Sequence, residues 1–263
     1  VSIQAEGISK VYGDFVALHE LSFSVGSSTV VAFLGPNGAG KSTMLGVLSG
    51  VTKPVIGDVA LGGRPVSGMA PQDVARQRAV LPQHSELAFG FRVFELVMMG
   101  RTPTAYPGSR DRDEMIAEAC MAETEVGHLA DRIYSDLSGG EKQRVHMARV
   151  LAQIDFPVEQ PAGTPRYLLL DEPTSSLDLP HQHTTLAMAR RAAERGIGVM
   201  AILHDLNLAA MYADQVAVLA DGRLKARGTP EEVLTADTVE DVFHLPVTIS
   251  QHPTRGCPHV IAV

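Results

Sequence analysis

Residues 35–43 read GPNGAGKST, and residues 35–42 fill every position of the pattern G-x-x-x-x-G-K-[ST]. The apolar run VVAFL (residues 30–34) precedes this segment, and MLGVLSG, which has helical spacing, follows it. This order predicts a buried strand, a tight loop and a helix. Such a loop binds phosphate well because its backbone N–H groups and the positive end of the helix face the anion. The alternative, a glycine-rich turn before a purely structural helix, is disfavoured by the strand–loop–helix context.

Individual side chains of the loop have separate tasks in this interpretation. Gly38 and Gly40 let the backbone approach the phosphates, Lys41 would reach the β- and γ-phosphates, and the Ser42 hydroxyl would bind Mg²⁺. The sequence therefore predicts a nucleotide and Mg²⁺ as ligands. The expected nucleotide-binding residues of the loop are Gly35, Pro36, Asn37, Gly38, Ala39, Gly40, Lys41, Ser42 and Thr43.

A second apolar run, residues 167–170, leads directly into Asp171 and Glu172. Ligands of α/β proteins bind at the carboxyl edge of the sheet, where such residues lie. Asp171 is placed to hold Mg²⁺, and Glu172 can polarise a water molecule for in-line attack on the γ-phosphate. Because many strands end in a solvated acidic residue, Asp171 and Glu172 indicate a catalytic site only in combination with the phosphate loop around Lys41.

Strand-like and helix-like segments alternate on both flanks of the chain, which predicts an α/β fold with a mostly parallel sheet and crossover helices. Partial alternation over residues 17–25 suggests an antiparallel sheet near the N-terminus. Helical spacing over residues 112–123 and 138–152 favours an inserted helical segment, and the tail after residue 229 suggests two short helices and a terminal strand or loop. We expect one domain, 1–263, with a nucleotide-binding core (1–85 and 165–263) and a helical subdomain (86–164).

Composition excludes several classes of protein. The 263 residues carry 22 Lys and Arg against 30 Asp and Glu, a net charge of −8, which argues against a nucleic-acid binder. None of the apolar runs approaches the ~18–20 residues that cross a bilayer, and no signal peptide is evident. Cys120 and Cys257 are too far apart and too few for a disulfide framework. We therefore expect a soluble intracellular protein.

Residues 137–144 read LSGGEKQR. Together with the phosphate loop and LLLDEPTSSLD (residues 168–178), this octapeptide resembles the ATP-binding subunits of ABC transporters. Ser138 can cap a helix whose positive N-terminus, with Gly139 and Gly140, would form a second anion site. In the family this site contacts the γ-phosphate bound to a partner subunit. The resemblance therefore implies a P-loop ATPase core with an inserted helical subdomain, and a homodimer that encloses two ATP molecules.

The resemblance implies further roles, one position at a time. Tyr12 matches the aromatic residue that stacks on adenine, with a half-buried strand tyrosine as the plain alternative. Gln83 matches the residue that completes the Mg²⁺ shell and senses the membrane partner. His204 matches the histidine that bonds the γ-phosphate and orients the water molecule of Glu172, so both are expected to be catalytic. Asp178 resembles a residue that crosses the dimer interface.

Within this family, FELVMMGRTP (residues 94–103) and DLPHQ (178–182) resemble importers of iron chelates, heme and vitamin B12. The proline-rich stretch 154–166 and the HQH sequence at 181–183 look most like hemin-import subunits. The implied protein is a peripheral ATPase on the cytoplasmic face of the inner membrane. Its partners would be two permease copies and, indirectly, a periplasmic or surface substrate-binding protein.

Two alternatives stay open at this stage. The cargo could be a ferric siderophore or vitamin B12. The chain could also be an ABC ATPase outside transport, although such proteins need long coiled coils or tandem cassettes, and the sequence has neither.

The permease is expected to dock near residues 83–101. The candidate contacts Phe89, Phe91, Met98 and Met99 could equally form the core of this segment.

Two histidine-containing stretches carry no predicted metal. His181 and His183 diverge at i, i+2 on a helix, which is typical of a solvated helix start. Cys257 with His252 and His259 fits a flexible tail, and we assign no ligand role to them.

Overall fold

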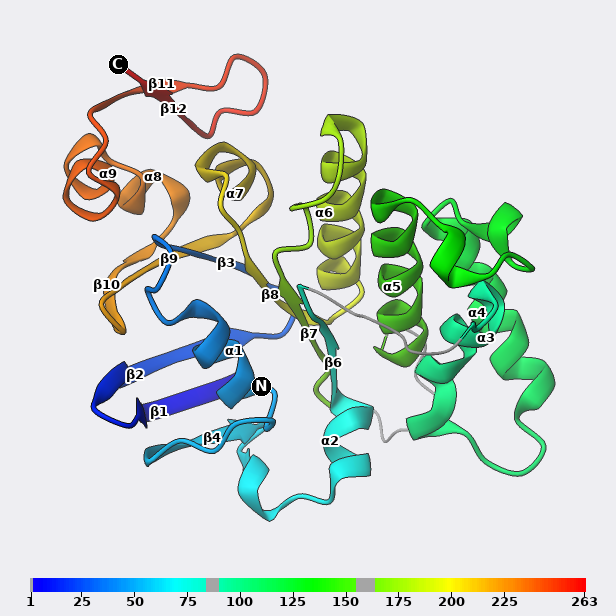
Figure 1. The fold of residues 1–263 in the computed structure, drawn as a ribbon. Coiled ribbons are helices and arrows are strands. Elements are labelled where there is room, and N and C mark those ends of the chain that lie inside the picture. The colour runs from blue at the N-terminus through cyan, green and yellow to red at the C-terminus, as the bar shows by residue number, and fades with distance from the viewer. Residues whose placement is uncertain (1, 84–89, 155–163) are drawn as a thin grey trace.

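The computed structural model describes residues 2–83, 90–154 and 164–263. Its central sheet has the strand order β10-β9-β3-β8-β7-β6 (Figure 1). Neighbouring strands in it are parallel except for the antiparallel pair β9–β10. The bounds are β3 (Val30–Leu34), β6 (Arg78–Leu81), β7 (Tyr167–Asp171), β8 (Gly198–Ile202), β9 (Gln215–Ala220) and β10 (Arg223–Gly228). The expected mostly parallel sheet is confirmed.

An antiparallel sheet of order β2-β1-β4-β5 comes from the N-terminal part of the chain, as predicted. Its strands are β1 (Ser2–Tyr12), β2 (Phe15–Gly26), β4 (Ile56–Leu61) and β5 (Arg64–Pro65). Helix α1 (Lys41–Leu48) follows the phosphate loop and shares a buried apolar cluster with this sheet and one face of the central sheet. The N-terminal sheet therefore covers that face, with α1 between the two layers.

The central strands alternate between two buried clusters, as the period of two in a strand requires. In β3, Val31 and Phe33 join the cluster around α1, whereas Val30, Ala32 and Leu34 join the cluster on the opposite face. Because both faces are covered, β3, β7 and β8 are buried at every position. Continuous apolar runs, rather than alternation, are therefore the correct sequence signal for these strands.

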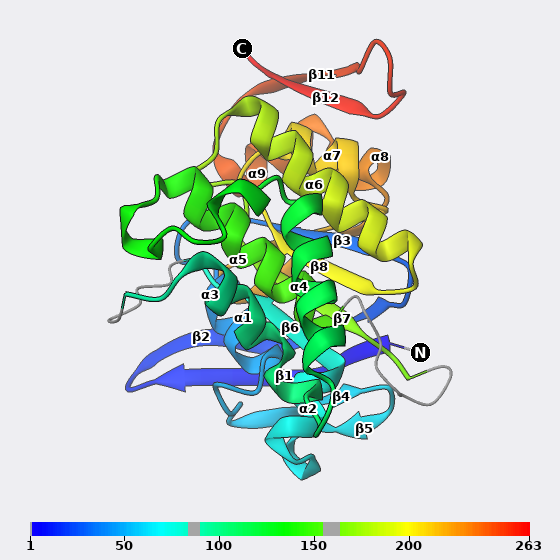
Figure 2. The same ribbon diagram turned by 90° about the vertical axis from the view of Figure 1, so that its right-hand side faces the viewer.

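Helices cover the opposite face of the central sheet (Figure 2). Helices α5 (Gly139–Ile154), α6 (Leu179–Glu194) and α7 (Leu206–Tyr212) lie against its strands, whereas α3 (Val93–Met98) and α4 (Arg110–Glu123) pack on α5. Helix α2 (Pro71–Gln77) precedes β6, and short 3-10 turns occur at η1 (Val66–Gly68), η2 (Met99–Thr104), η3 (Gly127–Leu129) and η4 (Tyr134–Asp136). Residues of α3, α4 and α5 share one apolar cluster with the sheet. The division into a core and a subdomain over 86–164 stays a prediction.

The GRTP segment joins three of these helical elements. A Cβ on Gly100 would lie 2.2 Å from the Arg149 carbonyl oxygen, so η2 and α5 approach more closely than a side chain allows. Arg101 is 1% exposed; its Nε donates to Asp113 in α4 at 2.9 Å, and its guanidinium also donates to the Ala152 carbonyl of α5. Gly100 and Arg101 therefore have structural roles here.

The tail forms α8 (Pro230–Val233), α9 (Ala236–Phe243) and a hairpin of β11 (Val247–Gln251) and β12 (Pro258–Ala262). The two short helices are confirmed, and the expected terminal strand is a pair of strands. Most of the proline-rich stretch 154–166 and the candidate contact Phe89 lie outside the described residues. Over the described ranges we find no helix that combines the length and apolar character needed to cross a membrane.

Candidate functional site

Four adjacent parallel strands, β3, β8, β7 and β6, end at the same edge of the central sheet. The phosphate loop follows β3, His204 lies two residues beyond β8, Asp171 ends β7, and Gln83 lies two residues beyond β6. Residues far apart in the sequence therefore meet at this carboxyl edge, where α/β sheets bind ligands.

The phosphate loop lies against the start of β2. Gly40, the residue before α1, has φ 97°, and a Cβ on it would lie 2.5 Å from the Ala17 carbonyl oxygen. A cavity of about 220 Å³ opens beside the loop. It is lined by Phe15, Ala17, Asn37, Gly38, Ala39, Gly40, Lys41, Ser42, Thr43 and Glu172.

Lys41 folds back onto its own loop. It is 6% exposed, and its Nζ donates to the carbonyl oxygens of Gly35 at 2.6 Å and Pro36 at 2.9 Å. Burial lowers the pKa of Lys41, and the negative charges of Glu172 and Asp171 oppose that shift. The ammonium group is thus held at the cavity by neutral acceptors that an anion can replace.

The Glu172 carboxylate is contacted from two neighbouring strands. Gln83 Nε2 donates to Glu172 Oε2 at 2.6 Å, and His204 Nε2 lies 2.7 Å from Glu172 Oε1. The Glu172 side chain is 14% exposed, whereas that of His204 is 46% exposed. Three of the predicted site residues therefore form one hydrogen-bonded group at the phosphate-loop cavity.

The residues expected to hold Mg²⁺ fit that ion. Ser42, Gln83 and Asp171 offer a hydroxyl, an amide and a carboxylate oxygen, the hard ligands that Mg²⁺ prefers. The bond to Glu172 uses the nitrogen of the Gln83 amide, so its carbonyl oxygen faces elsewhere. Across the described residues, no group of three or more His, Cys, Asp or Glu side chains could hold a metal. A Mg²⁺ ion here would therefore also depend on phosphate oxygens.

The LSGGEKQR motif forms the start of α5, as predicted. Ser138 Oγ accepts from the Glu141 N–H at 3.3 Å, and Glu141 Oε2 accepts from the Ser138 N–H at 2.8 Å. These reciprocal bonds form a capping box, and the hydrogen bonds from Ser138 lower the pKa of Glu141. Gly139 and Gly140 lie against Ser176 and Leu177, which directly precede Asp178.

Asp178 caps α6. It accepts from the His181 N–H at 3.3 Å and pairs with the His181 ring, and the latter bond is the main cause of its lowered pKa. His183 Nδ1 instead lies 2.9 Å from Tyr212 Oη. The two histidines thus have different partners on different sides of the helix.

The predicted site residues therefore fall into two groups. The loop half-site comprises residues 35–43, Gln83, Asp171, Glu172 and His204. The signature half-site comprises Ser138, Gly139, Gly140 and Asp178. Within the described part of the chain, no residue of the signature half-site lines the phosphate-loop cavity.

Two neighbouring aromatic residues differ in their relation to this cavity, and stacking of Tyr12 on adenine stays a prediction. Tyr12 and Phe15 are cross-strand neighbours in β1 and β2, and Phe15 lines the cavity, whereas Tyr12, 50% exposed, is not among the lining residues. Lys10 Nζ lies 5.1 Å from the Tyr12 ring centroid. Sequence reasoning missed Phe15. The available signal was its position two residues before Ala17, because residues i and i+2 of a strand lie on the same face of the sheet.

The candidate permease contacts differ in exposure. Met98 packs against the apolar cluster of the helical face, and Met99 is 39% exposed. In the tail, the His252 and His259 rings lie 5.9 Å apart between centroids, and Cys257 is buried. A permease contact at Phe91, Met98 or Met99 stays a prediction.

A phosphate loop after a central parallel strand, with acidic and amide side chains at the ends of the neighbouring strands, defines a P-loop nucleotide-binding protein. The chain belongs to the ABC transporter family, whose profile matches residues 18–175.

Relatives match almost the entire chain. The hemin import ATP-binding protein HmuV of Gloeobacter violaceus is 51% identical over 259 residues, which cover 98% of this chain and 93% of that protein. The protein of the same name from Pseudomonas entomophila is 48% identical and covers 98% and 99% of the two chains. A solved structure described as a metal-chelate type ABC transporter in an inward-facing conformation superposes with a TM-score of 0.79 at 26% identity, covering 100% of this chain and 97% of the other.

Proposed function

We propose that this chain is the ATP-hydrolysing subunit of a membrane importer and that the imported compound is heme. The observation that carries the hydrolytic part is the Glu172 carboxylate, which lines the phosphate-loop cavity and contacts both Gln83 and His204. The relatives named hemin import ATP-binding proteins support the heme part. Import of a ferric siderophore or vitamin B12 is the second candidate, because FELVMMGRTP resembles all three groups.

ATP binding begins at the loop half-site. The backbone N–H groups of the loop and the N-terminus of α1 surround the phosphates, and Lys41 exchanges its two carbonyl acceptors for phosphate oxygens. Ser42, Asp171 and the Gln83 carbonyl would hold Mg²⁺, which supplies charge neutralisation for the phosphates when bound. Tyr12 would stack on the adenine, as the family resemblance implies.

Hydrolysis requires a water molecule in line with the γ-phosphate. Glu172 accepts a proton from that water molecule, and His204 bonds the γ-phosphate and orients the attacking water. In the present structure Gln83 and His204 occupy both oxygens of Glu172. Each carboxylate oxygen can accept a second hydrogen bond, so Glu172 can also bind the attacking water molecule.

The signature half-site acts on a second copy of the chain. Its capped helix N-terminus offers N–H groups and a positive dipole to an anion, and the capping bonds of Ser138 fix their direction. A head-to-tail homodimer would then enclose two ATP molecules, each between one phosphate loop and one signature motif. Asp178 would cross the interface.

The membrane partner is a pair of permease subunits, and the chain is peripheral on the cytoplasmic face of the inner membrane. Gln83 lies two residues beyond β6 and bonds directly to Glu172. A displacement of Gln83 by the permease would therefore reach the catalytic carboxylate. A periplasmic or surface substrate-binding protein delivers the cargo without touching this chain.

The test is the ATPase rate of the chain co-purified with its permease and reconstituted in lipid. The substrate-binding protein is added empty or loaded with heme, a ferric siderophore or vitamin B12. We expect heme to stimulate turnover above the empty protein and above the other two cargoes. Stimulation by another cargo alone would replace heme in the proposal, and failure to isolate any permease complex would contradict the importer.

A further inference from the structure

Helix α7 starts two residues after His204, the expected catalytic histidine. Asp205 caps it, because its Oδ1 accepts from the Asn207 N–H at 2.7 Å and the Leu208 N–H at 2.9 Å. His204 therefore sits in the three-residue link, residues 203–205, between β8 and the first turn of α7. The position of the His204 backbone therefore depends on the position of the first turn of α7.

The side chain of Asn207 joins this turn to the C-terminal hairpin. Its Nδ2 donates to the Val260 carbonyl at 3.1 Å, and its Oδ1 accepts from the Val260 N–H at 2.7 Å. Val260 lies opposite Ile249 of β11, and both of its backbone groups face away from β11, at the outer edge of β12. Asn207 thus pairs with this edge as a backbone amide of a neighbouring strand would, since a carboxamide offers both a donor and an acceptor.

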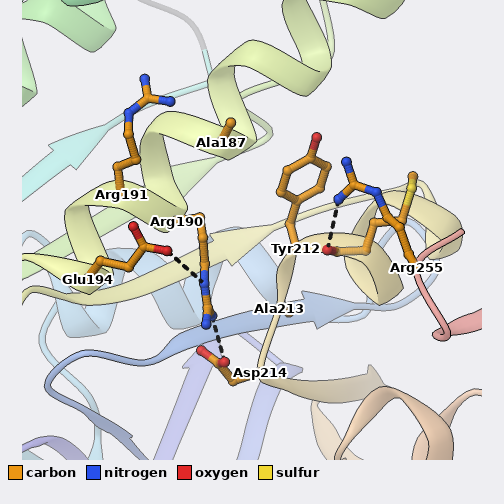
Figure 3. Close-up of a pocket in the computed structure, with 9 residues that line it drawn as sticks. Ala187, Arg190, Arg191, Glu194, Tyr212, Ala213, Asp214 and Arg255 are labelled. Carbon is orange, nitrogen blue, oxygen red and sulfur yellow. Dashed lines mark hydrogen bonds and ion pairs between the residues drawn. The ribbon is translucent and has the colours of Figure 1, made fainter.

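A second contact lies at the other end of α7 (Figure 3). Arg255, in the turn of the hairpin, stacks on Tyr212 with its guanidinium carbon 4.9 Å from the ring centroid, and it donates to the Met211 carbonyl at 3.4 Å. The hairpin therefore spans α7 from its first turn to its last.

The opposite side of the hairpin is less closely packed. An open groove of about 680 Å³ lies between the hairpin and the segment around the start of α9, lined among others by Leu234, Val247 and Cys257. Helix α7 has seven residues, and a helix of two turns is not stable without tertiary contacts. Of the contacts made by the hairpin, the one at Asn207 is nearest in sequence to His204.

We propose that the C-terminal hairpin braces α7, and that Asn207 is a positioning residue that holds His204 in reach of Glu172 through this brace. The catalytic consequence rests on the proposed function, because it requires that His204 acts in ATP hydrolysis. The mechanical part, that the hairpin fixes the first turn of α7, does not require any activity.

Hydrogen exchange of the full chain tests the mechanical part. Asn207→Asp keeps the size and the acceptor but turns the donor into a second acceptor that faces the Val260 carbonyl. Amides of residues 205–208 should exchange about tenfold faster than in the wild type. Arg255→Ala is the matched control: it removes the far contact and should leave these amides within about twofold of the wild type. Unchanged exchange at residues 205–208 in Asn207→Asp would overturn the brace.

Steady-state kinetics test the catalytic part. Asn207→Asp should lower kcat about tenfold with the KM for ATP within about twofold, and it should cause no further loss in a His204→Gln background, because both changes act through the same group. Equal losses of kcat in both backgrounds would mean that Asn207 acts elsewhere, which overturns the positioning role. Absence of ATPase activity in the wild-type permease complex would contradict the proposed function instead, and the exchange experiment would still decide whether the brace exists.

Discussion

The backbone conformation of Glu172 determines the direction of its carboxylate. Glu172 has φ 48°, a left-handed conformation that costs a non-glycine residue about 1–3 kcal/mol. Its N–H donates to the Ile202 carbonyl at 3.2 Å, and its own carbonyl accepts from Ser175 Oγ at 3.1 Å. This turn takes Glu172 out of the alternation of β7, so that its carboxylate meets Gln83 and His204 instead of following the strand.

Glu172→Gln tests the role of the carboxylate. The amide keeps the shape of the side chain but cannot accept a proton from water, so turnover should fall by at least about 100-fold while ATP binding persists. Because the closed dimer would no longer be opened by hydrolysis, ATP should also produce a stable dimer. The measurements are the ATPase rate and size-exclusion chromatography with ATP. Turnover at the wild-type rate would refute the general-base assignment.

A tryptophan at the position of Phe15 should report nucleotide binding. The chain contains no tryptophan, so Phe15→Trp and Tyr12→Trp each introduce a single fluorescent reporter. Since Phe15 lines the cavity, ATP should change the emission of Phe15→Trp at least as strongly as that of Tyr12→Trp. A response of Tyr12→Trp alone would place the nucleoside away from Phe15.

Between elements, the buried ion pair of Arg101 and Asp113 ties η2 to α4, with 1% and 4% of the two side chains exposed. Arg101→Ala should lower the free energy of unfolding by about 3–5 kcal/mol, because it leaves a buried carboxylate without its cation. The double variant Arg101→Met, Asp113→Leu should recover most of that loss. Urea unfolding measures both, and equal stability of Arg101→Ala and the wild type would show that the pair is not needed.

His146 in α5 predicts a dependence of stability on pH. Burial, assisted by the charge of Arg149, lowers the pKa of His146 from 6.5 to about 4, and its Nε2 lies 2.8 Å from Tyr134 Oη. Between these pKa values the unfolded chain binds a proton that the folded chain does not, so stability falls as the pH drops. The contribution of His146 to the free energy of unfolding should be about 2 kcal/mol smaller at pH 5 than at pH 7.

His146→Gln provides the control for this pH dependence. Urea unfolding at the two pH values should show a smaller pH effect in His146→Gln by that amount. The same pH effect in the variant and the wild type would assign the dependence to other groups.

Elements differed in how well the sequence predicted them. The strands that carry the site were evident, because β3, β7 and β8 are buried on both faces and therefore read as unbroken apolar runs. The hairpin was only partly foreseen. Half of its strand residues are exposed and a six-residue connection separates the strands, so neither periodicity nor a short turn signal marks them. In the sequence, Arg101 stood out only as part of a motif shared with a family. Its burial was not predicted, because it depends on how α4 and α5 pack against each other.

Sequence patterns also predicted only part of the candidate site. The loop half-site was predictable because each residue follows a recognisable strand, and parallel strands end at one edge. The place of Phe15 in the lining of the phosphate-loop cavity depends on the β1–β2 register, which shifts at three places. The brace at Asn207 joins residues 53 positions apart through a side chain, and no local pattern encodes such a pairing.

At the scale of the whole molecule, the two half-sites belong to one chain but do not share a cavity in its described part. Each is locally complete: Lys41 and Glu172 line the cavity of one, and reciprocal capping bonds fix the other. This arrangement fits a protein that is active as a pair of chains. Every active site would therefore combine the phosphate loop of one copy with the signature motif of another.

Complementation between two inactive variants tests whether the sites are shared between copies. Lys41→Ala removes the phosphate contact, and Ser138→Arg blocks the signature; each variant alone should be nearly inactive. A mixed dimer has one site with both defects and one site with neither. An equimolar mixture should therefore recover about a quarter of the wild-type ATPase rate if the sites act independently. A mixture no more active than the mean of the two variants would contradict sites shared between copies.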